Sequence, residues 1–134
     1  MTVKSYSLKI NTNKSFEIID ITSQINNLID IDEGIISIFS KHSTSAIVVN
    51  ENESGLLNDL EFTLDNLIDD KFSCKHDKID NNAKSHLKSF LLSSSESLPI
   101  KNSKLDLGTW QSVFFIELDG PRSGRTVTLT MVGE

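Results

Sequence analysis

The alternation of apolar and polar residues near the end of the chain constrains the fold more than any other feature. From Arg125 to Val132, the apolar residues Val127, Leu129 and Met131 alternate with three threonines. Successive side chains of a strand point to opposite faces, so a period of two predicts a strand with one buried and one polar face. Such a strand is typical of an antiparallel sheet that covers a core on one side.

Further strands follow from the same kind of pattern. Residues 3–10 alternate and, with a turn at 11–14 and a strand at 15–19, predict an N-terminal hairpin. Two apolar runs rich in β-branched residues, 35–39 and 46–49, predict central strands buried on both faces. The remaining predicted strands are 97–100, 109–118 and 125–132.

Apolar residues at helical spacing predict helices at 53–68 and 82–92, and a short third helix ends near Ile29. The leucines from Leu56 to Leu67 are expected in the core. The core face of the later helix is expected to comprise Ala83, Leu87, Phe90 and Leu91. Trp110, among apolar strand neighbours, is expected in the core or at a subunit interface.

The order of these elements predicts one α+β domain, residues 1–134, with a largely antiparallel, sandwich-like sheet and two or three helices. The net charge of −6 argues against nonspecific binding to nucleic acid, which requires a basic surface. No apolar run approaches the ~18 residues needed to cross a bilayer. The single cysteine, Cys74, excludes an intramolecular disulfide and favours a reducing, cytoplasmic location.

All three histidines lie in dense polar motifs: His42, His76 and His86. Imidazole binds transition metals and transfers protons near neutral pH. Three neutral imidazoles meeting at one place would leave open positions on a divalent metal ion, with zinc the first choice. Their spacings match no zinc-finger pattern, and each residue taken alone is more often an ordinary packed or exposed histidine.

Several motifs occur in an order that resembles one family. They are 34–39 running into His42-Ser43-Thr44-Ser45-Ala46, then 82–88, Leu107-Gly108-Thr109-Trp110-Gln111, and 117–122. From about residue 5 to its end, the chain resembles the YjbQ family, also called UPF0047, of secondary thiamine-phosphate synthases. The resemblance implies a homotrimer with sites near subunit boundaries, a histidine-held metal ion and a modest thiamine-phosphate synthase activity.

One departure from the family pattern concerns an acidic position. Members commonly carry an acidic residue just before the position of Asn82, where this chain has Asn81, with Asp80 one place earlier. If that carboxylate has a role in the family, either the role is lost here or Asp80 takes it.

Three residues are candidates for catalysis: Glu51, His86 and Gln111. Glu51 follows a buried strand and precedes a helix, from where its carboxylate could reach a cleft as a general acid or base. The alternative is an acidic residue that interacts with the helix dipole. His86 and Gln111 complete the catalytic set, since Gln111 points away from the apolar face of its strand.

Five residues are candidates for binding phosphate or substrate. Ser43, Thr44 and Asn82 offer polar groups for an anionic oxygen, although turn and capping chemistry explains them nearly as well. Arg122 and Arg125 are the only arginines, and they bracket a glycine-containing turn. Guanidinium binds phosphate through two parallel hydrogen bonds, which makes this turn a candidate phosphate clamp. The alternative is a pair of salt bridges, to Glu117 or Asp119.

These observations favour an enzyme that acts on a phosphorylated small molecule at a histidine-lined, metal-binding site. By resemblance it is a transferase that joins a pyrimidine pyrophosphate to a thiazole phosphate and releases pyrophosphate. Whether this would be a main or a side activity stays open. The alternative is a noncatalytic trimer that binds an anion or metabolite.

Overall fold

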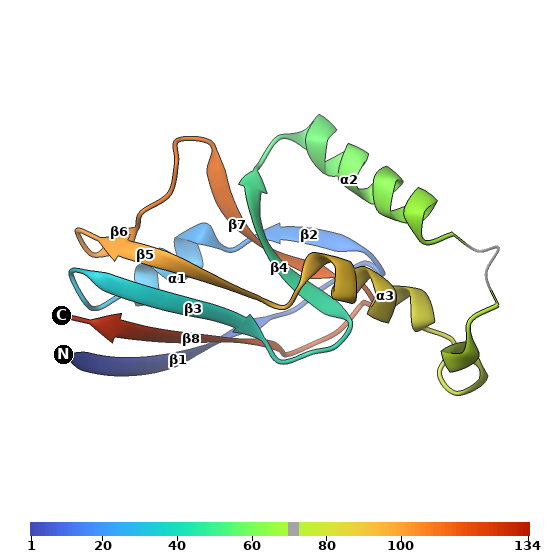
Figure 1. Ribbon diagram of the computed structural model, residues 1–134, viewed down its shortest axis with the longest axis horizontal. Helices are drawn as coiled ribbons and strands as arrows, with labels where there is room; N and C mark the ends of the chain where they lie inside the picture. Colours follow the sequence, from blue (N-terminus) through green and yellow to red (C-terminus); the bar gives the residue numbers. More distant parts are fainter. Residues whose placement is uncertain (70–72) are drawn as a thin grey trace.

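The computed structural model describes residues 1–69 and 73–134 as two antiparallel sheets with helices at one end and along one side (Figure 1). The predicted α+β class is confirmed. In chain order the elements are β1 (Thr2–Ile10), β2 (Glu17–Asp20), α1 (Thr22–Leu28), β3 (Gly34–Ser40), β4 (Ser45–Glu51), α2 (Ser54–Leu67), the 3-10 helix η1 (Lys75–Lys78), α3 (Ala83–Leu92), β5 (Ser95–Lys101), β6 (Lys104–Leu105), β7 (Gln111–Glu117) and β8 (Arg125–Gly133).

The larger sheet has the order β1-β8-β3-β5-β6, and the smaller sheet has the order β2-β7-β4. The predicted N-terminal hairpin is therefore wrong, because β1 pairs with β8 and β2 pairs with β7. The turn between β1 and β2 carries the chain from one sheet to the other. The backbone N–H of Thr12 in this turn donates to the carbonyl of Arg122 at 2.8 Å, which ties the turn to the loop before β8.

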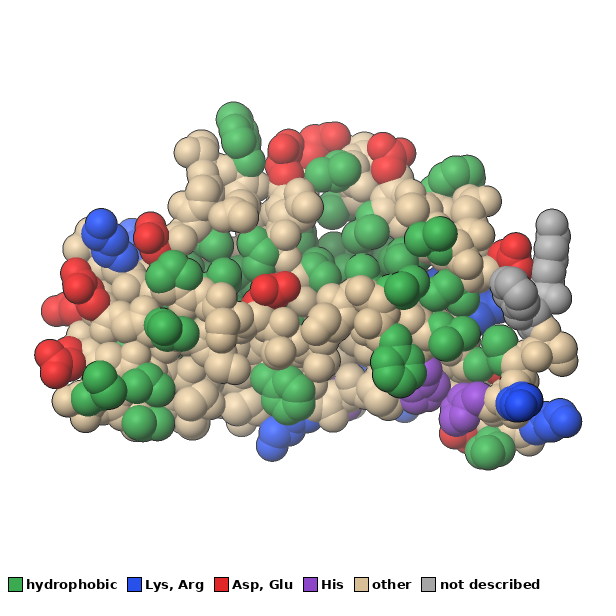
Figure 2. All heavy atoms as spheres, viewed as in Figure 1, with side chains coloured by type: hydrophobic (Ala, Val, Ile, Leu, Met, Phe, Trp, Pro, Cys, Tyr) green, Lys and Arg blue, Asp and Glu red, His purple; other side chains and the backbone are tan. Residues whose placement is uncertain are grey.

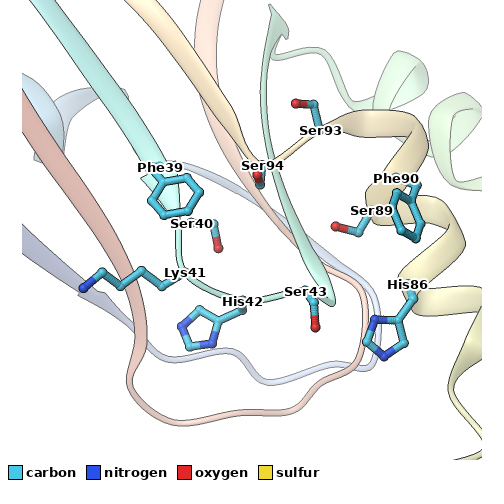
Figure 3. A pocket seen from close by; sticks show the side chains of 10 residues that line it. All are labelled: Phe39, Ser40, Lys41, His42, Ser43, His86, Ser89, Phe90, Ser93 and Ser94. Atoms are coloured by element: carbon cyan, nitrogen blue, oxygen red, sulfur yellow. The ribbon is translucent and has the colours of Figure 1, made fainter.

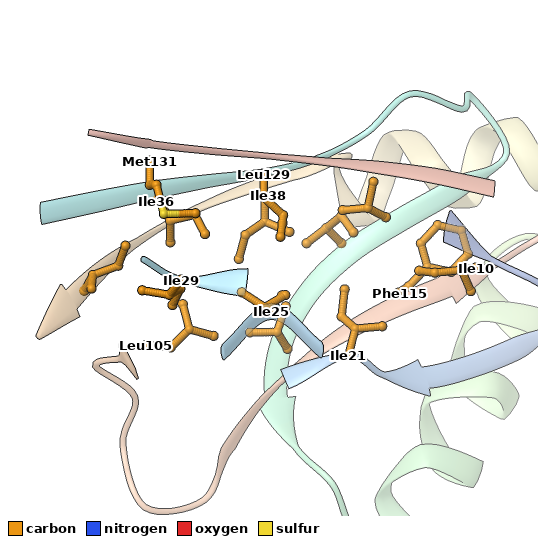
Figure 4. Packing of buried hydrophobic residues seen from close by; sticks show 14 of the residues in the cluster. Ile10, Ile21, Ile25, Ile29, Ile36, Ile38, Leu105, Phe115, Leu129 and Met131 are labelled. Atoms are coloured by element: carbon orange, nitrogen blue, oxygen red, sulfur yellow. The ribbon is translucent and has the colours of Figure 1, made fainter. Parts of the chain in front are cut away.

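The main core lies between the two sheets, with α1 packed into it (Figure 4). The inward face of the larger sheet supplies Ile36, Ile38, Leu129 and Met131, as the alternation of β8 predicts, and α1 contributes Ile25. A second cluster, on the other face of the smaller sheet, is closed by side chains of α2 and α3. Its buried members are Ala46, Phe114, Ile116 and Leu118.

The predicted burial of β3 on both faces is wrong. Ile35 is 58% exposed and Phe39 is 41% exposed, because both point to the outer face of the larger sheet. Trp110 is 74% exposed within the single chain, so of its two predicted places the core is wrong and the subunit interface stays a prediction. Apolar composition alone did not distinguish a strand buried on both faces from a strand with an apolar outer face.

The apolar faces of α2 and α3 extend beyond the core. In α2 only Leu64 is buried, whereas Leu56 and Leu67 are 40% and 63% exposed, so the predicted core position of these two leucines is wrong. In α3, Leu87, Phe90 and Leu91 are 41%, 84% and 61% exposed, so their predicted core positions are wrong. The two predicted helices are confirmed. Each helix lies near an edge of the molecule, however, and only part of its apolar face packs against the core. Over the residues the structure describes, no helix is long and apolar enough to cross a membrane.

Three connections meet at the end of the molecule opposite the two termini (Figure 1). They are the β3–β4 loop, the β7–β8 turn and the segment between η1 and α3. Gly120 permits this arrangement, because a Cβ atom there would lie 2.2 Å from the backbone oxygen of Lys14. The β7–β8 turn can therefore pack against the β1–β2 turn only with glycine at this position.

Candidate functional site

A polar hollow of about 350 Å³ lies where these three connections meet. Histidine side chains gather at the same end of the molecule (purple in Figure 2). The hollow is lined by Lys41, His42, Ser43, Thr44, Asp80, Asn82, His86, Asp119, Arg122 and Arg125. An adjoining hollow of about 460 Å³ shares His42, Ser43 and His86 and adds Phe39 and Phe90 (Figure 3). The combined space has a polar part and an aromatic part.

A buried ion pair supports one wall of the polar hollow. Arg125, the first residue of β8, points inward with 5% exposure and meets the fully buried Glu117 at the end of β7. Its Nε donates to Glu117 Oε1 at 2.9 Å, and its Nη2 contacts the other carboxylate oxygen. Nη2 also donates to Thr44 Oγ1 at 3.0 Å, and Thr12 donates its hydroxyl to Glu117 at 2.7 Å. The cluster joins β7, β8 and two loops.

The balance of burial and hydrogen bonding fixes the charge of Glu117. Burial acts to raise the pKa of its carboxyl, but hydrogen bonds from Arg125 and Thr12 outweigh it and hold that pKa below its ordinary value. Arg125 and Thr44, which were predicted to bind phosphate, both line the hollow. The guanidinium of Arg125 is bonded to Glu117 and Thr44, as in the salt-bridge alternative, and Thr44 is buried.

Hydrogen bonding fixes the protonation of His42 in the β3–β4 loop. Its Nε2 accepts a hydrogen bond from the backbone N–H of Thr126 at 2.8 Å. Burial lowers the pKa of its imidazole, and the positive charge of Arg125 lowers it further, which Glu117 only partly offsets. His42 is therefore neutral near pH 7. Since Nε2 accepts, the proton of the neutral ring is on Nδ1.

A chain of side-chain hydrogen bonds crosses the other side of the hollow. His76 Nε2 lies 3.0 Å from Asn82 Oδ1, and Asn82 Nδ2 donates to Asp119 Oδ2 at 3.0 Å. Arg122 Nη2 donates to the same Asp119 oxygen at 3.0 Å, and its Nε donates to the Asp119 carbonyl at 2.9 Å. Asn82, expected to bind substrate, thus links η1 to the β7–β8 turn. Arg122 is held over the hollow by Asp119.

His86 and Asp80 complete the lining on the helical side. The rings of His86 and His76 meet edge to face, with centroids 4.8 Å apart. Asp80 lines the hollow, and its carboxylate lies 3.8 Å from His76 Nε2. Asn81 has a φ of 55°, a left-handed conformation that asparagine tolerates well, and it is not among the lining residues. Of the two candidates for the family's acidic position, Asp80 is therefore the one at the hollow.

The structure tests the expected three-histidine metal site through its donor atoms. Metal coordination requires a ring nitrogen with a free lone pair, whereas Nε2 of His42 accepts from Thr126 and its Nδ1 carries the proton. Within 1–69 and 73–134, no three histidine, cysteine or acidic side chains are grouped so that they could hold a metal ion. His42, His76 and His86 do not fit the expected site in this arrangement.

Two of the three predicted catalytic residues lie far from the hollow. Glu51 pairs with Gln111 across β4 and β7, whereas Ser45, beside the hollow, pairs with Glu117 at the other end of the same strands. Glu51 is six steps along β4 from Ser45, or about 20 Å at ~3.3 Å per residue. Of the predicted catalytic set, only His86 lines the hollow. Glu53 caps α2 with its carboxylate, the alternative role considered for Glu51.

Three lining residues were not predicted as site residues: Lys41, Asp80 as a lining group, and Asp119. Lys41 directly precedes His42, and Asp119 begins the turn that carries Arg122. The signal that could have found them is their position within the same motifs. Asp119 was considered only as an ion-pair partner of an arginine, a role that the structure confirms.

Comparison with known proteins places the chain among one group of relatives. A family model described as UPF0047 protein YjbQ-like matches residues 6–134. A UPF0047 protein of Methanothermobacter thermautotrophicus is 46% identical over 137 residues, covering 100% of this chain and 95% of the relative. A UPF0047 protein of Archaeoglobus fulgidus is 42% identical, with 90% and 95% covered.

Solved structures show the same fold. A YbjQ-like protein of unknown function from Sulfolobus solfataricus superposes with a TM-score of 0.94 and is 40% identical, covering 99% of both chains. A hypothetical protein from Aeropyrum pernix superposes with a TM-score of 0.89 at 31% identity and covers 100% of both chains. The arrangement of sheets and helices described above is thus shared along the whole length.

Proposed function

The chain belongs to the YjbQ family, also called UPF0047, and from the polar hollow we propose that it is an enzyme acting on a phosphorylated small molecule. The observation that carries this proposal is the meeting of Lys41, Arg122, His42 and His86 in one hollow, although the chain has a net charge of −6. Clustered donors and cations in an acidic protein favour an anionic ligand at this place.

The side chains that line the hollow have different proposed roles. Arg122 and Lys41 bind phosphoryl oxygens, with the exposed hydroxyl of Ser43 beside them. His86 transfers a proton, since it is the imidazole in the hollow for which the structure gives no hydrogen-bonded partner among the described residues. The aromatic part of the space, at Phe39 and Phe90, receives an apolar ring of the substrate.

For the reaction itself we propose a thiamine-phosphate synthase-like transfer, in which a thiazole phosphate displaces pyrophosphate from a pyrimidine pyrophosphate. The departing pyrophosphate carries most of the charge that develops, and Arg122 and Lys41 would neutralise it. The proposal rests on the family resemblance for the identity of the substrates. The hollow supports it through the proximity of cations to an aromatic surface.

A noncatalytic anion- or metabolite-binding protein is the second candidate. The observation that favours it is the position of Glu51 and Gln111, about 20 Å along β4 and β7 from the hollow, so that of the three predicted catalytic residues His86 alone lines it. Binding of phosphorylated ligands without turnover of any of them would establish this second candidate.

We propose a homotrimer as the assembly. Large exposed apolar side chains on α3 and before β7, including Phe90 and Trp110, support association because such surfaces commonly mark interfaces. Cytoplasmic location stays part of the proposal, in keeping with the free thiol of Cys74. Uptake of a divalent metal ion, zinc first, stays a prediction of the family resemblance alone, since the histidines do not fit it in this arrangement, and metal analysis of untagged protein measures it.

The first experiment measures binding of inorganic pyrophosphate by calorimetry and synthesis of thiamine phosphate from the two phosphorylated precursors. Arg122→Gln should weaken pyrophosphate binding at least tenfold, since a charge-assisted hydrogen bond contributes about 1.5–3 kcal/mol. Lys104→Gln is the matched control, because this exposed lysine lies on β6 at the opposite end of the molecule. Equal loss in both variants, or no binding by the unmodified protein, would refute the proposed site.

A further inference from the structure

We propose that His42 serves this site as a neutral hydrogen-bond donor, presenting Nδ1–H to an anionic phosphoryl oxygen, and does not ligate a metal ion. The inference rests on the proposed function, because it takes the phosphorylated ligand as its premise. It differs from the metal site expected from the resemblance, and the disagreement comes from the hydrogen bonds of a single ring.

The Nε2 atom of His42 already accepts a hydrogen bond. A backbone N–H can only donate, so the 2.8 Å contact from Thr126 occupies the lone pair of His42 Nε2. An imidazolium carries protons on both nitrogens and could not accept this bond. The hydrogen bond therefore selects the neutral ring with its proton on Nδ1.

The surroundings of the His42 ring disfavour its positively charged form. Arg125, whose side chain is 6% exposed, and Arg122, at the rim of the hollow, both disfavour a positive imidazole, as does the partial burial of the ring. Glu117 would favour a positive ring, but its carboxylate is already bonded to Arg125 and Thr12. A neutral donor adds hydrogen bonding to the site without another desolvated charge.

The Nδ1–H group of His42 is available to a ligand in the hollow. His42 lines both hollows, and Figure 3 shows its ring and that of His86 directed to the same side, with the Ser43 hydroxyl between them. Among the residues that the structure describes, none accepts a hydrogen bond from Nδ1. A donor beside Lys41 and Arg122 is suited to a phosphoryl oxygen, because all three groups can then bind the negative charge of the same phosphoryl group.

The atoms of amide side chains allow the two nitrogens to be tested separately. The amide nitrogen of asparagine is two bonds from Cβ, as Nδ1 is in histidine, and the terminal atoms of glutamine are three bonds from Cβ, as Nε2 is. His42→Asn thus keeps a donor near the Nδ1 position. His42→Gln keeps an acceptor for the Thr126 amide.

The two substitutions should therefore differ in what they weaken: His42→Gln mainly lowers pyrophosphate affinity, and His42→Asn mainly lowers thermal stability. We expect His42→Gln to bind pyrophosphate at least tenfold more weakly than the unmodified protein, and His42→Asn to retain at least fivefold more affinity than His42→Gln. We expect the melting temperature to fall more in His42→Asn, because the Thr126 amide loses its acceptor. Equal affinity of His42→Gln and the unmodified protein would overturn the donor role.

Nitrogen-15 NMR of the ligand-free protein tests the tautomer without any substrate. A protonated Nδ1 and an unprotonated Nε2 are expected for His42 at pH 7, and the opposite tautomer would overturn the inference. So would loss of a bound metal ion on changing His42 to Asn. If the unmodified protein binds no pyrophosphate, the proposed function fails and the donor role fails with it. Binding that is indifferent to His42→Gln removes the donor role alone.

Discussion

Arg125 and Arg122 lie three residues apart, and each pairs with a carboxylate at the end of β7, yet their surroundings are opposite. The side chains of Arg125 and Glu117 are 6% and 0% exposed, whereas those of Arg122 and Asp119 are 52% and 28% exposed. One pair joins strands and loops inside the molecule. The other lies at the rim of the hollow, where an incoming anion can reach the guanidinium.

The difference shows why one arginine supports structure and the other is available for binding. Separating a buried pair leaves a desolvated charge without a partner, which costs several kcal/mol. An exposed pair contributes about 0–1 kcal/mol, because water replaces each partner at little cost. Arg122 can therefore exchange Asp119 for a phosphoryl group, while Arg125 remains bound to Glu117 and positions Thr44.

The largest expected effect is on the buried pair. Glu117→Gln should reduce the free energy of unfolding by about 3–5 kcal/mol, because Arg125 stays charged and buried without a carboxylate. Urea unfolding followed by circular dichroism measures the change. Glu61→Gln, on the exposed face of α2, is the matched control and should shift stability by less than about 0.5 kcal/mol. A loss below 1 kcal/mol at Glu117 would show that the pair is effectively solvated.

The fold was largely predictable because most of its elements follow a simple period. Alternation placed Val127, Leu129 and Met131 in the core, where the structure has them. Pairing of strands was not predictable at the N-terminus, because a short turn between two strands suggests a hairpin whether or not the chain changes sheets there. The 84% exposure of Phe90 was also missed, because an exposed apolar residue at helical spacing has the same pattern as one in a core.

The site was predictable as a set of motifs but not as a geometry. His42, His86 and Arg122 do share one hollow. Glu51 and Gln111 do not, since their register partners were needed to place them at the far end of the smaller sheet. The salt bridge of Arg125 to Glu117 was considered as an alternative, but its burial was not predictable, because Glu117 looks like a surface residue until the sheets are assembled.

An effect of intermediate size is expected from pH, and it distinguishes the buried side of the site from the exposed one. Because the folded pKa of His42 is lowered, the unfolded chain binds the proton more tightly, so this contribution to stability is complete above about pH 6.5. It is lost as the pH falls from there toward the lower folded value. Glu117, also lowered, loses its contribution only below about pH 4.5.

Unfolding by urea between pH 7.5 and 5.5 tests this sign. The unmodified protein should lose more stability over that range than His42→Gln, which has no proton to bind at this position. A stability of the unmodified protein, relative to that of His42→Gln, which falls as the pH rises from 5.5 to 7.5 would contradict the neutral state of His42.

The smallest expected effect on stability comes from the exposed pair, where the consequence is instead on binding. Asp119→Asn should change the free energy of unfolding by less than about 1 kcal/mol, because water replaces the lost contact with Arg122. Pyrophosphate affinity should rise severalfold, since a negative charge leaves the hollow and the guanidinium no longer has to be released from it. Calorimetry of Asp119→Asn with and without Arg122→Gln separates these two causes. If the gain persists without Arg122, removal of charge alone explains it; if it disappears, the exposed pair is a competitor of the ligand, which the buried pair cannot be.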